Sequence, residues 1–239
     1  MAIANVASAI AQMAVNSDAT LTTSSIDTSG ANFIAVAIAV GEGATGFTVT
    51  DNKSNGNATA TAATYAYVGA GTRLTIYIWE NPTVGSGHTF TLNKGTGSLS
   101  GGMAVRAFSG VATSSSTDRT SVNNTPNTTS VQPGSITPTE ANELVLCAWT
   151  MAGNGVTDTP TTSGLTAASA LPRQTTGGGI FPIGLGYVIQ TTAAAVNPTW
   201  SWTSADFATS VIASFKQAAG GASFNPGVAR ATTMIGGVF

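Results

Sequence analysis

The stretch Ala31-Asn32-Phe33-Ile34-Ala35-Val36 decides the fold, because this apolar strand pattern recurs at Ala141-Asn142-Glu143-Leu144-Val145-Leu146, an offset of 110 residues. Three further strand-like segments recur in the same order, at offsets of 111, 110 and 107 residues. These pairs are Leu74 to Ile78 with Leu185 to Ile189, Thr89 to Leu92 with Thr199 to Trp202, and Ala104 to Phe108 with Val211 to Phe215. The spacing predicts that one set of strands occurs twice in the chain.

Short strands separated by turn-forming residues account for the chain from Ile26 to Phe215. The run Phe33 to Val40 is apolar throughout, as expected of a strand that is buried on both faces. Leu74 to Trp79 alternates, and Asp51 to Asn57 contains an Asn-Gly pair that predicts a hairpin turn. Only Asn5 to Val15 has a spacing that would suit a helix, so we expect an all-β fold.

Two architectures agree with the repeat: two tandem domains of about 110 residues, or one sandwich in which each half supplies strands to both sheets. The link from Val111 to Pro138 is rich in Ser, Thr, Asn and Pro, as a linker would be. Each half offers only about five strands, however, and a lone five-stranded sheet leaves its apolar face exposed. We therefore favour a single, interleaved antiparallel β-sandwich of about 8 to 10 strands, jelly-roll-like and built from two pseudo-repeats, with the link as a surface crossover.

The two ends of the chain differ from this pattern. We expect an N-terminal arm at 1–25, the β-sandwich at 26–218 and an extended C-terminal tail at 219–239. Ordering a tail with two Gly pairs costs about 1 to 2 kcal/mol per residue, which only burial of its large apolar side chains can offset. We therefore expect the tail to clamp a partner through Phe224, Met234, Ile235, Val238 and Phe239.

The composition is unusually poor in charge. Lys and Arg number 8 and Asp and Glu number 10, which gives a net charge of −2. Duplex binding depends on Lys and Arg that neutralise phosphates, so the composition argues against nucleic acid as a partner. A polar surface made of hydroxyls and amides costs little to desolvate, and it suits assembly with neighbouring proteins.

The apolar N-terminus has no preceding Lys or Arg and is interrupted by Asn5, Ser8 and Gln12, so it predicts neither a signal peptide nor a membrane span. We expect a soluble protein that is made in a cytoplasm. Cys147, the only cysteine, lies in the apolar run Leu144 to Trp149. There it is expected to act as a small buried hydrophobe and not as a nucleophile.

Residues that could carry catalysis or hold a metal are few, and we expect neither a catalytic residue nor a cofactor or metal site. His88, the sole histidine, follows Gly85-Ser86-Gly87 and is interpreted as a solvated turn residue. Period-2 geometry directs Glu140 and Glu143 to opposite faces, so they do not form a general acid and base pair.

The remaining acidic residues are also isolated in the sequence. Asp118 and Asp158 lie in loops without an acidic neighbour. Asp51 to Asn55 resembles a calcium loop only superficially, because the acidic residues that such a loop needs at alternating positions are missing.

Tryptophan offers the one alternative with a binding role. Trp200 and Trp202 share one side of their strand and are candidates for stacking on sugar rings, while Trp79 and Trp149 are less well placed. Packing in the core or at a sheet edge is the competing interpretation, and the one that we favour for all four.

Several segments together resemble a family of β-sandwich proteins found among bacteriophage virion proteins. The matching motifs are Val49 to Asn55, Leu74 to Trp79, Val105 to Val111 and, in the second half, Asn142 to Val145. The resemblance covers most of residues 26–217. It implies a capsid decoration protein, a head fibre or a tail-associated protein, and it brings no catalytic residues with it.

Three functions follow as hypotheses. The first is a non-enzymatic capsid decoration or cement protein on the outside of a bacteriophage virion, which contacts the major capsid protein and further copies of itself. The alternative is a tail fibre or spike module that recognises host-surface glycan through Trp200 and Trp202. A carbohydrate-active enzyme would need a convergent acidic pair, and none is evident among the ten acidic residues.

Overall fold

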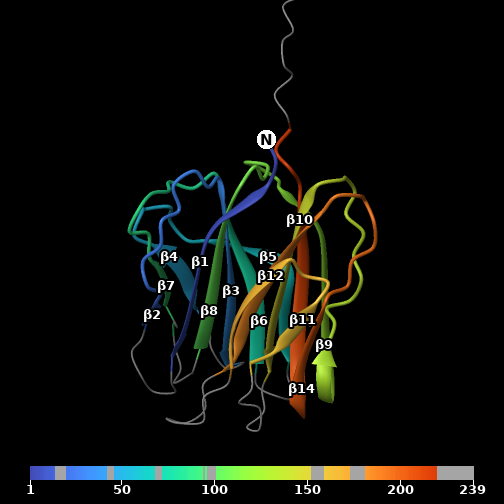
Figure 1. Ribbon diagram of the computed structural model, residues 1–239. Helices are drawn as coiled ribbons and strands as arrows, with labels where there is room; N and C mark the ends of the chain where they lie inside the picture. The colour runs from blue at the N-terminus through green and yellow to red at the C-terminus, as the bar shows by residue number, and fades with distance from the viewer. Residues whose placement is uncertain are drawn as a thin grey trace, which may run out of the picture.

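The computed structural model describes residues 1–13, 20–41, 46–67, 72–93, 95, 101–151, 159–172 and 181–219. These residues form fourteen strands and no helix, so the expected all-β class is confirmed (Figure 1). The strands are β1 (Ala4–Met13), β2 (Thr20–Thr22), β3 (Phe33–Gly41), β4 (Thr48–Asp51), β5 (Thr59–Tyr67), β6 (Thr72–Glu80), β7 (Phe90–Asn93), β8 (Gly101–Ser109), β9 (Thr117–Val131), β10 (Glu143–Met151), β11 (Thr161–Ser163), β12 (Ala167–Leu171), β13 (Ile183–Gln190) and β14 (Thr199–Phe215).

Sheet 1 comes from the first half of the chain, with the antiparallel strand order β1-β8-β3-β6-β5. All nine residues of its central strand β3 are buried. Phe33 and Ala35 point to one face of the sheet, while Ile34 and Val36 point to the other, and each set belongs to a separate hydrophobic cluster. The continuous apolar run in the sequence therefore reflects a strand that is covered on both sides, as predicted.

Sheet 2 comes from the second half, with the order β11-β14-β10-β13-β12, and β9 also pairs with β14. The long strand β14 serves two layers. Its first residues, Thr199 to Ser201, pair with β11, and its last residues, Ala208 to Phe215, pair with β10. The central strand β10 is buried along its whole length, like β3 in sheet 1.

The two large sheets pack face to face and share one hydrophobic cluster. Phe33 of sheet 1 contacts Phe215 of sheet 2 with ring centroids 4.8 Å apart. Each sheet has a second cover on its far face: sheet 3 (β2-β7-β4) on sheet 1, and the start of β14 with β11 on sheet 2. This packing of antiparallel sheets is consistent with a β-sandwich.

The predicted interleaving of the two halves is wrong. Each of the three sheets is built from one half of the chain, and strands of both halves meet only by packing. The physical reason lies in β3 and β10, which are apolar on both faces. A five-stranded sheet with two apolar faces must pack against another layer on each face. Here the large sheet of the other half of the chain packs on one face, and short strands of the same half pack on the other.

The expected N-terminal arm at 1–25 is also wrong as far as the structure describes it. Ala4–Met13 forms β1, an edge strand of sheet 1 paired with β8, and Thr20–Thr22 forms β2, which pairs with β7. The helical spacing that we noted from Asn5 onward therefore lies in a strand. Pairing of the backbone with β8, and contact of Ala9 with the buried cluster under sheet 3, override the local pattern.

Two connections differ from their predictions. The link at 111–138 contains β9, which pairs along β14, so most of it is sheet and not a surface crossover. The turn at Asp51 to Asn57 joins β4 of sheet 3 to β5 of sheet 1, which do not pair with each other. It is an arch between layers and not a hairpin turn.

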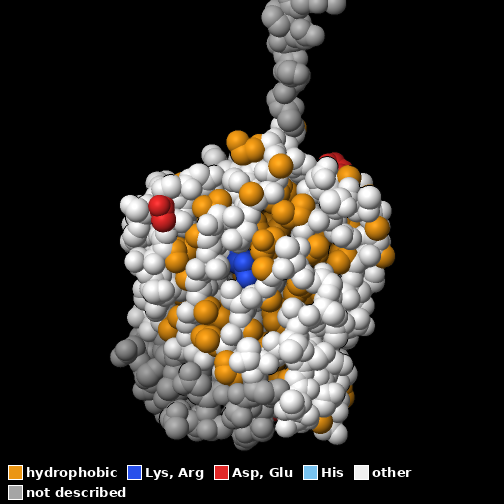
Figure 2. Space-filling model, viewed as in Figure 1, with side chains coloured by type: hydrophobic (Ala, Val, Ile, Leu, Met, Phe, Trp, Pro, Cys, Tyr) orange, Lys and Arg blue, Asp and Glu red, His pale blue; other side chains and the backbone are white. Residues whose placement is uncertain are grey.

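Arg106 of β8 joins the two halves. It is 4% exposed, and its guanidinium donates to the carbonyl of Leu185 (3.1 Å), to Asn5 Oδ1 (3.3 Å) and to Ser169 Oγ (3.1 Å). The guanidinium also lies 5.1 Å from the ring centroid of Tyr187. On the face shown in Figure 2, the blue of Lys and Arg appears near the middle, among hydrophobic and uncharged side chains.

Candidate functional site

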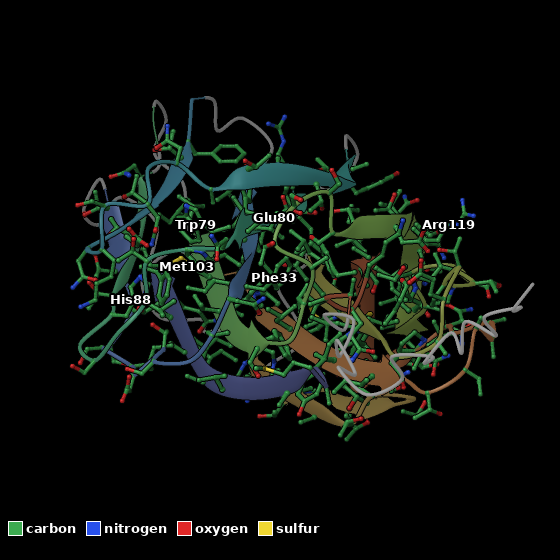
Figure 3. The ribbon with its side chains drawn as sticks, turned by 90° about the horizontal axis from the view of Figure 1, so that it is seen from above. Phe33, Trp79, Glu80, His88, Met103 and Arg119 are labelled. Atoms are coloured by element: carbon green, nitrogen blue, oxygen red, sulfur yellow. The ribbon has the colours of Figure 1, made fainter. Side chains whose placement is uncertain are left out.

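Asp51, His88 and Thr28 form a buried hydrogen-bonded chain. His88 Nε2 lies 2.9 Å from Asp51 Oδ2, and His88 Nδ1 lies 2.8 Å from Thr28 Oγ1. The side chains of His88 and Asp51 are 0% exposed, and the imidazole stacks on Phe90 at 4.3 Å between ring centroids. In the view from above, His88 lies at the opposite side of the molecule from Arg119 (Figure 3).

The hydroxyl, imidazole and carboxylate of this chain match the residue types of a nucleophilic triad, but burial rules out that use. Thr28 is 0% exposed, and its Oγ1 also bonds to the N–H (3.1 Å) and carbonyl (3.2 Å) of Gly85. A substrate carbonyl cannot reach this oxygen. The prediction of a solvated turn histidine is therefore wrong, and the three side chains hold loops together.

The residues around Asp51 extend the same network across two loops. Asn52 Nδ2 donates to the carbonyl of Gly87 (2.9 Å), and the N–H of Thr89 donates to Asn52 Oδ1 (3.0 Å). Lys53 Nζ donates to the carbonyl of Ser86 (2.9 Å). The motif that resembles a calcium loop is thus a clasp between the β4–β5 arch and the loop before β7.

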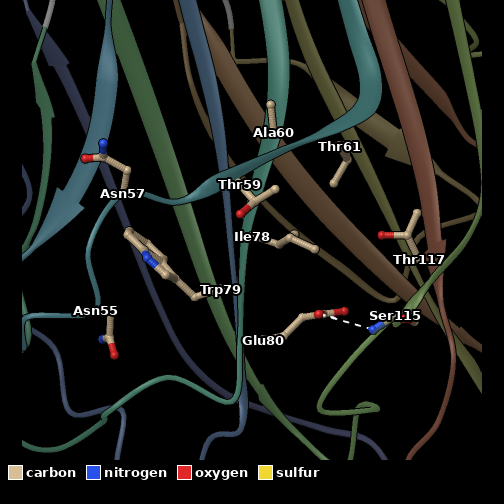
Figure 4. A pocket seen from close by; sticks show the side chains of 10 residues that line it. All are labelled: Asn55, Asn57, Thr59, Ala60, Thr61, Ile78, Trp79, Glu80, Ser115 and Thr117. Carbon is tan, nitrogen blue, oxygen red and sulfur yellow. Dashed lines mark hydrogen bonds between the residues drawn. The ribbon is translucent and has the colours of Figure 1, made fainter.

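A pocket of about 500 Å³ opens beside this clasp (Figure 4). It is lined by Asn55, Asn57, Thr59, Ala60, Thr61, Ile78, Trp79, Glu80, Ser115 and Thr117. Among these described lining residues Glu80 is the only ionisable one, and both of its carboxylate oxygens accept backbone N–H groups, from Ser116 (2.6 Å) and Ser115 (3.2 Å). The pocket can offer hydroxyls and amides to a ligand, but its carboxylate is committed to holding the chain that leads into β9.

A carboxyl pair that the sequence analysis missed lies where β9 and β10 begin. Thr139 bridges it, because its N–H donates to Asp118 Oδ2 (2.8 Å) and its Oγ1 to Glu143 Oε1 (3.4 Å). Glu143 is fully buried and also accepts the N–H of Glu140 (3.1 Å). The description of Asp118 as having no acidic neighbour is wrong, since Glu143 is 25 residues away in sequence but adjacent in the fold.

The two carboxyls have opposite pKa shifts. Burial raises the pKa of Glu143 above its ordinary value, and the neighbouring Asp118 adds to this rise, against hydrogen bonds from Ser214 and Glu140. Burial also raises the pKa of Asp118, but hydrogen bonds from Thr139 and the charges of Arg119 and Lys216 outweigh it, so the net pKa is lowered. Glu143 is thus the member of the pair that holds a proton more tightly.

Replacing Glu143 by Gln should change how stability depends on pH. Because the folded-state pKa of Glu143 is raised, its contribution is fully present below the unfolded value of 4.5 and is lost as the pH rises through the folded value. Glu143→Gln cannot ionise, so it should gain stability relative to the wild type as the pH rises above about 4.5. Urea unfolding at several pH values measures this, with the exposed neighbour Glu140→Gln as control. Parallel pH profiles for wild type and Glu143→Gln would contradict the shift.

Trp200 and Trp202 lie in the core of the second half. They are 0% and 6% exposed, and both pack on Trp149, at 5.8 Å and 5.6 Å between ring centroids. Trp200 Nε1 donates to Cys147 Sγ (3.2 Å). Neither ring presents a face on which a sugar could stack, so the packing interpretation replaces the glycan-stacking one at these two residues.

Cys147 is buried, as predicted. Burial raises the pKa of its thiol to about 11, against weaker hydrogen bonds from Ser210 and Trp200. The thiolate that nucleophilic attack requires is therefore scarce near neutral pH.

The five tail residues expected to contact a partner, Phe224, Met234, Ile235, Val238 and Phe239, lie outside the described residues. Within the described ranges, no group of three or more His, Cys, Asp or Glu side chains is arranged to hold a metal ion. The same ranges contain no helix long and apolar enough to cross a membrane. Comparison with family models, curated proteins and solved structures finds no match to the chain.

Proposed function

We propose that the chain is a non-enzymatic structural protein of a bacteriophage virion, which decorates the outer surface of the capsid and contacts the major capsid protein and other copies of itself. The observation that carries the proposal is the order of strand pairing. The order β1-β8-β3-β6 in sheet 1, with β2-β7-β4 in sheet 3, agrees with the order expected for an eight-stranded jelly roll in which the fifth strand pairs in sheet 1 instead.

The second half repeats this order. There the order β9-β14-β10-β13 corresponds to β1-β8-β3-β6, with the last residues of β14 in the place of β8. The first residues of β14 take the place of β7, and they pair with Val131 at the end of β9 and with β11, which take the places of β2 and β4. This agreement supports two jelly-roll pseudo-repeats, joined through their large sheets. Jelly rolls recur in viral capsid and lectin domains, so the order favours a role in assembly or binding without selecting one chemistry.

The ionisable groups favour a structural role over catalysis. Asp51, His88, Glu80, Arg106 and Glu143 are each engaged in bonds that join loops, strands or the two halves. A chain with 8 basic and 10 acidic residues that uses several of them internally has few charges left for its surface. Such a surface loses little hydration energy when neighbours cover it.

Recognition of host glycan by a tail fibre is the weaker alternative. Its two nominated stacking residues, Trp200 and Trp202, are buried beside Trp149. The jelly-roll order would suit a lectin-like role, but the aromatic platform that it needs would have to come from residues other than these two.

Adding the purified chain to particles that lack it tests the proposal. We expect saturable co-sedimentation with the particles, and electron microscopy should show added density on the head surface. Density confined to the tail, together with retention on a glycan array, would favour the alternative. Absence of binding to any part of the particle would overturn the structural role.

A further inference from the structure

A groove of about 660 Å³ runs between β11 and β12 on the near face of the molecule, where Figure 1 places both strands. It is lined by Ile10, Thr159, Pro160, Thr161, Thr162, Leu165, Thr166, Ala167, Ala168, Ser169, Ala170 and Trp200. None of these twelve residues is charged, and most are Thr or Ala. The groove therefore lies between two strands and is lined by uncharged side chains, most of which are short.

The strand edges at the groove are open to backbone pairing. β12 lies at the end of its sheet and pairs only with β13 in the described part of the chain. It has none of the Lys, Pro or bulges that usually protect such an edge. Gln12 Nε2 donates to the carbonyls of Leu171 (3.4 Å) and Pro172 (3.0 Å), which leaves Thr166 to Ala170 as the open stretch.

We propose that this groove binds residues 228–235 of a second copy of the chain as an added strand. The segment VARATTMI is bounded by Pro226-Gly227 and Gly236-Gly237, which are the breakers expected on either side of one strand. Period-2 geometry places Ala229, Ala231, Thr233 and Ile235 on one side, and the first three are small enough to lie against Ala168 and Ala170. Pairing of the backbone with the open strand edge would supply the main contact.

The position at which the described chain ends favours a second copy as the source. The N–H of Ala218 donates to the carbonyl of Gly110 (2.8 Å), and Gln217 Nε2 donates to the carbonyl of Met1 (2.6 Å). The tail therefore leaves at the end of the molecule where β1 begins, whereas the groove meets β1 near its other end, at Ile10. The eight residues 220–227 that lead to the segment span up to about 26 to 29 Å when extended, enough to reach a molecule packed against that end, whereas folding back along β1 to the chain's own groove would use most of this length.

The inference rests on the proposed role in assembly, but its test needs no virus particle. Sedimentation velocity should show concentration-dependent oligomers for the full chain and monomers for the chain without residues 220–239. A labelled peptide of residues 226–239 should bind the truncated chain, with saturable fluorescence anisotropy. Ala168→Arg in the groove should weaken peptide binding at least about tenfold and abolish the oligomer. The matched control is Ala62→Arg on β5, which is also an exposed alanine in an edge strand and should leave both unchanged.

Three results would overturn the inference. Oligomers that persist in Ala168→Arg would place the contact elsewhere. A full-length monomer whose melting temperature falls on deletion of 220–239 would show that the tail binds its own groove. If Ala62→Arg weakens peptide binding as much as Ala168→Arg does, the peptide binds non-specifically and not in the groove. These experiments do not measure attachment to particles, so a negative result would contradict the groove proposal and not the proposed function.

Discussion

Asp51→Ala is expected to lower the free energy of unfolding by about 3 to 5 kcal/mol. The Asp51 carboxylate accepts the N–H groups of Lys53 (3.2 Å) and Asn55 (3.1 Å) in addition to its bond with His88 (2.9 Å). Its removal leaves the buried imidazole and two turn N–H groups without their acceptor, at a cost of about 1 to 3 kcal/mol each. Equilibrium unfolding in urea measures the loss.

Asp27→Ala is the matched control for Asp51→Ala. Asp27 also caps a turn, because the N–H of Ser29 donates to its Oδ1 (2.9 Å), but this bond is exposed to solvent. We expect a loss within about 1 kcal/mol, as for other exposed hydrogen bonds. Equal losses in the two variants would show that the clasp between the β4–β5 arch and the loop before β7 is not a major source of stability.

Trp200→Ala is expected to destabilise the protein by about 3 to 5 kcal/mol, the usual range for a fully buried aromatic side chain. The ring stacks on Trp149 with 16° between planes, and its edge fills the space over Gly184, where an added Cβ would lie 2.8 Å from the Trp200 ring. The substitution opens a cavity in the cluster under the second sheet. Thermal and urea unfolding both report the loss.

Phe207→Ala separates this core effect from simple loss of an aromatic residue. Phe207 is on the same strand, but it is 38% exposed, so its truncation should cost within about 1 kcal/mol. A Trp200→Ala variant with wild-type stability and reduced glycan retention would restore the sugar-stacking interpretation. A destabilised variant supports the packing interpretation.

The strands and their burial were predictable where the sequence pattern is local. Phe33 to Val40 and Leu144 to Trp149 are apolar without interruption, and such runs occur only where both faces of a strand are covered. The burial of Cys147 followed from its place in the second run. The covers themselves were not predictable, because which half of the chain covers a face depends on contacts far apart in sequence.

The contacts of the polar residues also depend on segments far apart in sequence, so they were not predictable from the local pattern. His88 is preceded by glycines that indicate an exposed turn, yet Thr28 and Asp51, 60 and 37 residues away in sequence, enclose it. The pairing of Asp118 with Glu143 likewise depends on β9 and β10 starting at the same end of sheet 2. Arg106 did carry a local signal, since a lone cation inside the apolar strand Gly101–Ser109 indicates a buried partner set.

The copy number of the chain in purified particles tests the central claim most directly. Particles from the lysate in which the chain is made would be banded on a density gradient, and the chain and the major capsid protein quantified by mass spectrometry with labelled standards. A structural decoration protein should be present in many copies, at a ratio to the major capsid protein that is constant between preparations. A chain that is absent from the particles, or present only in traces that vary between preparations, would contradict the account.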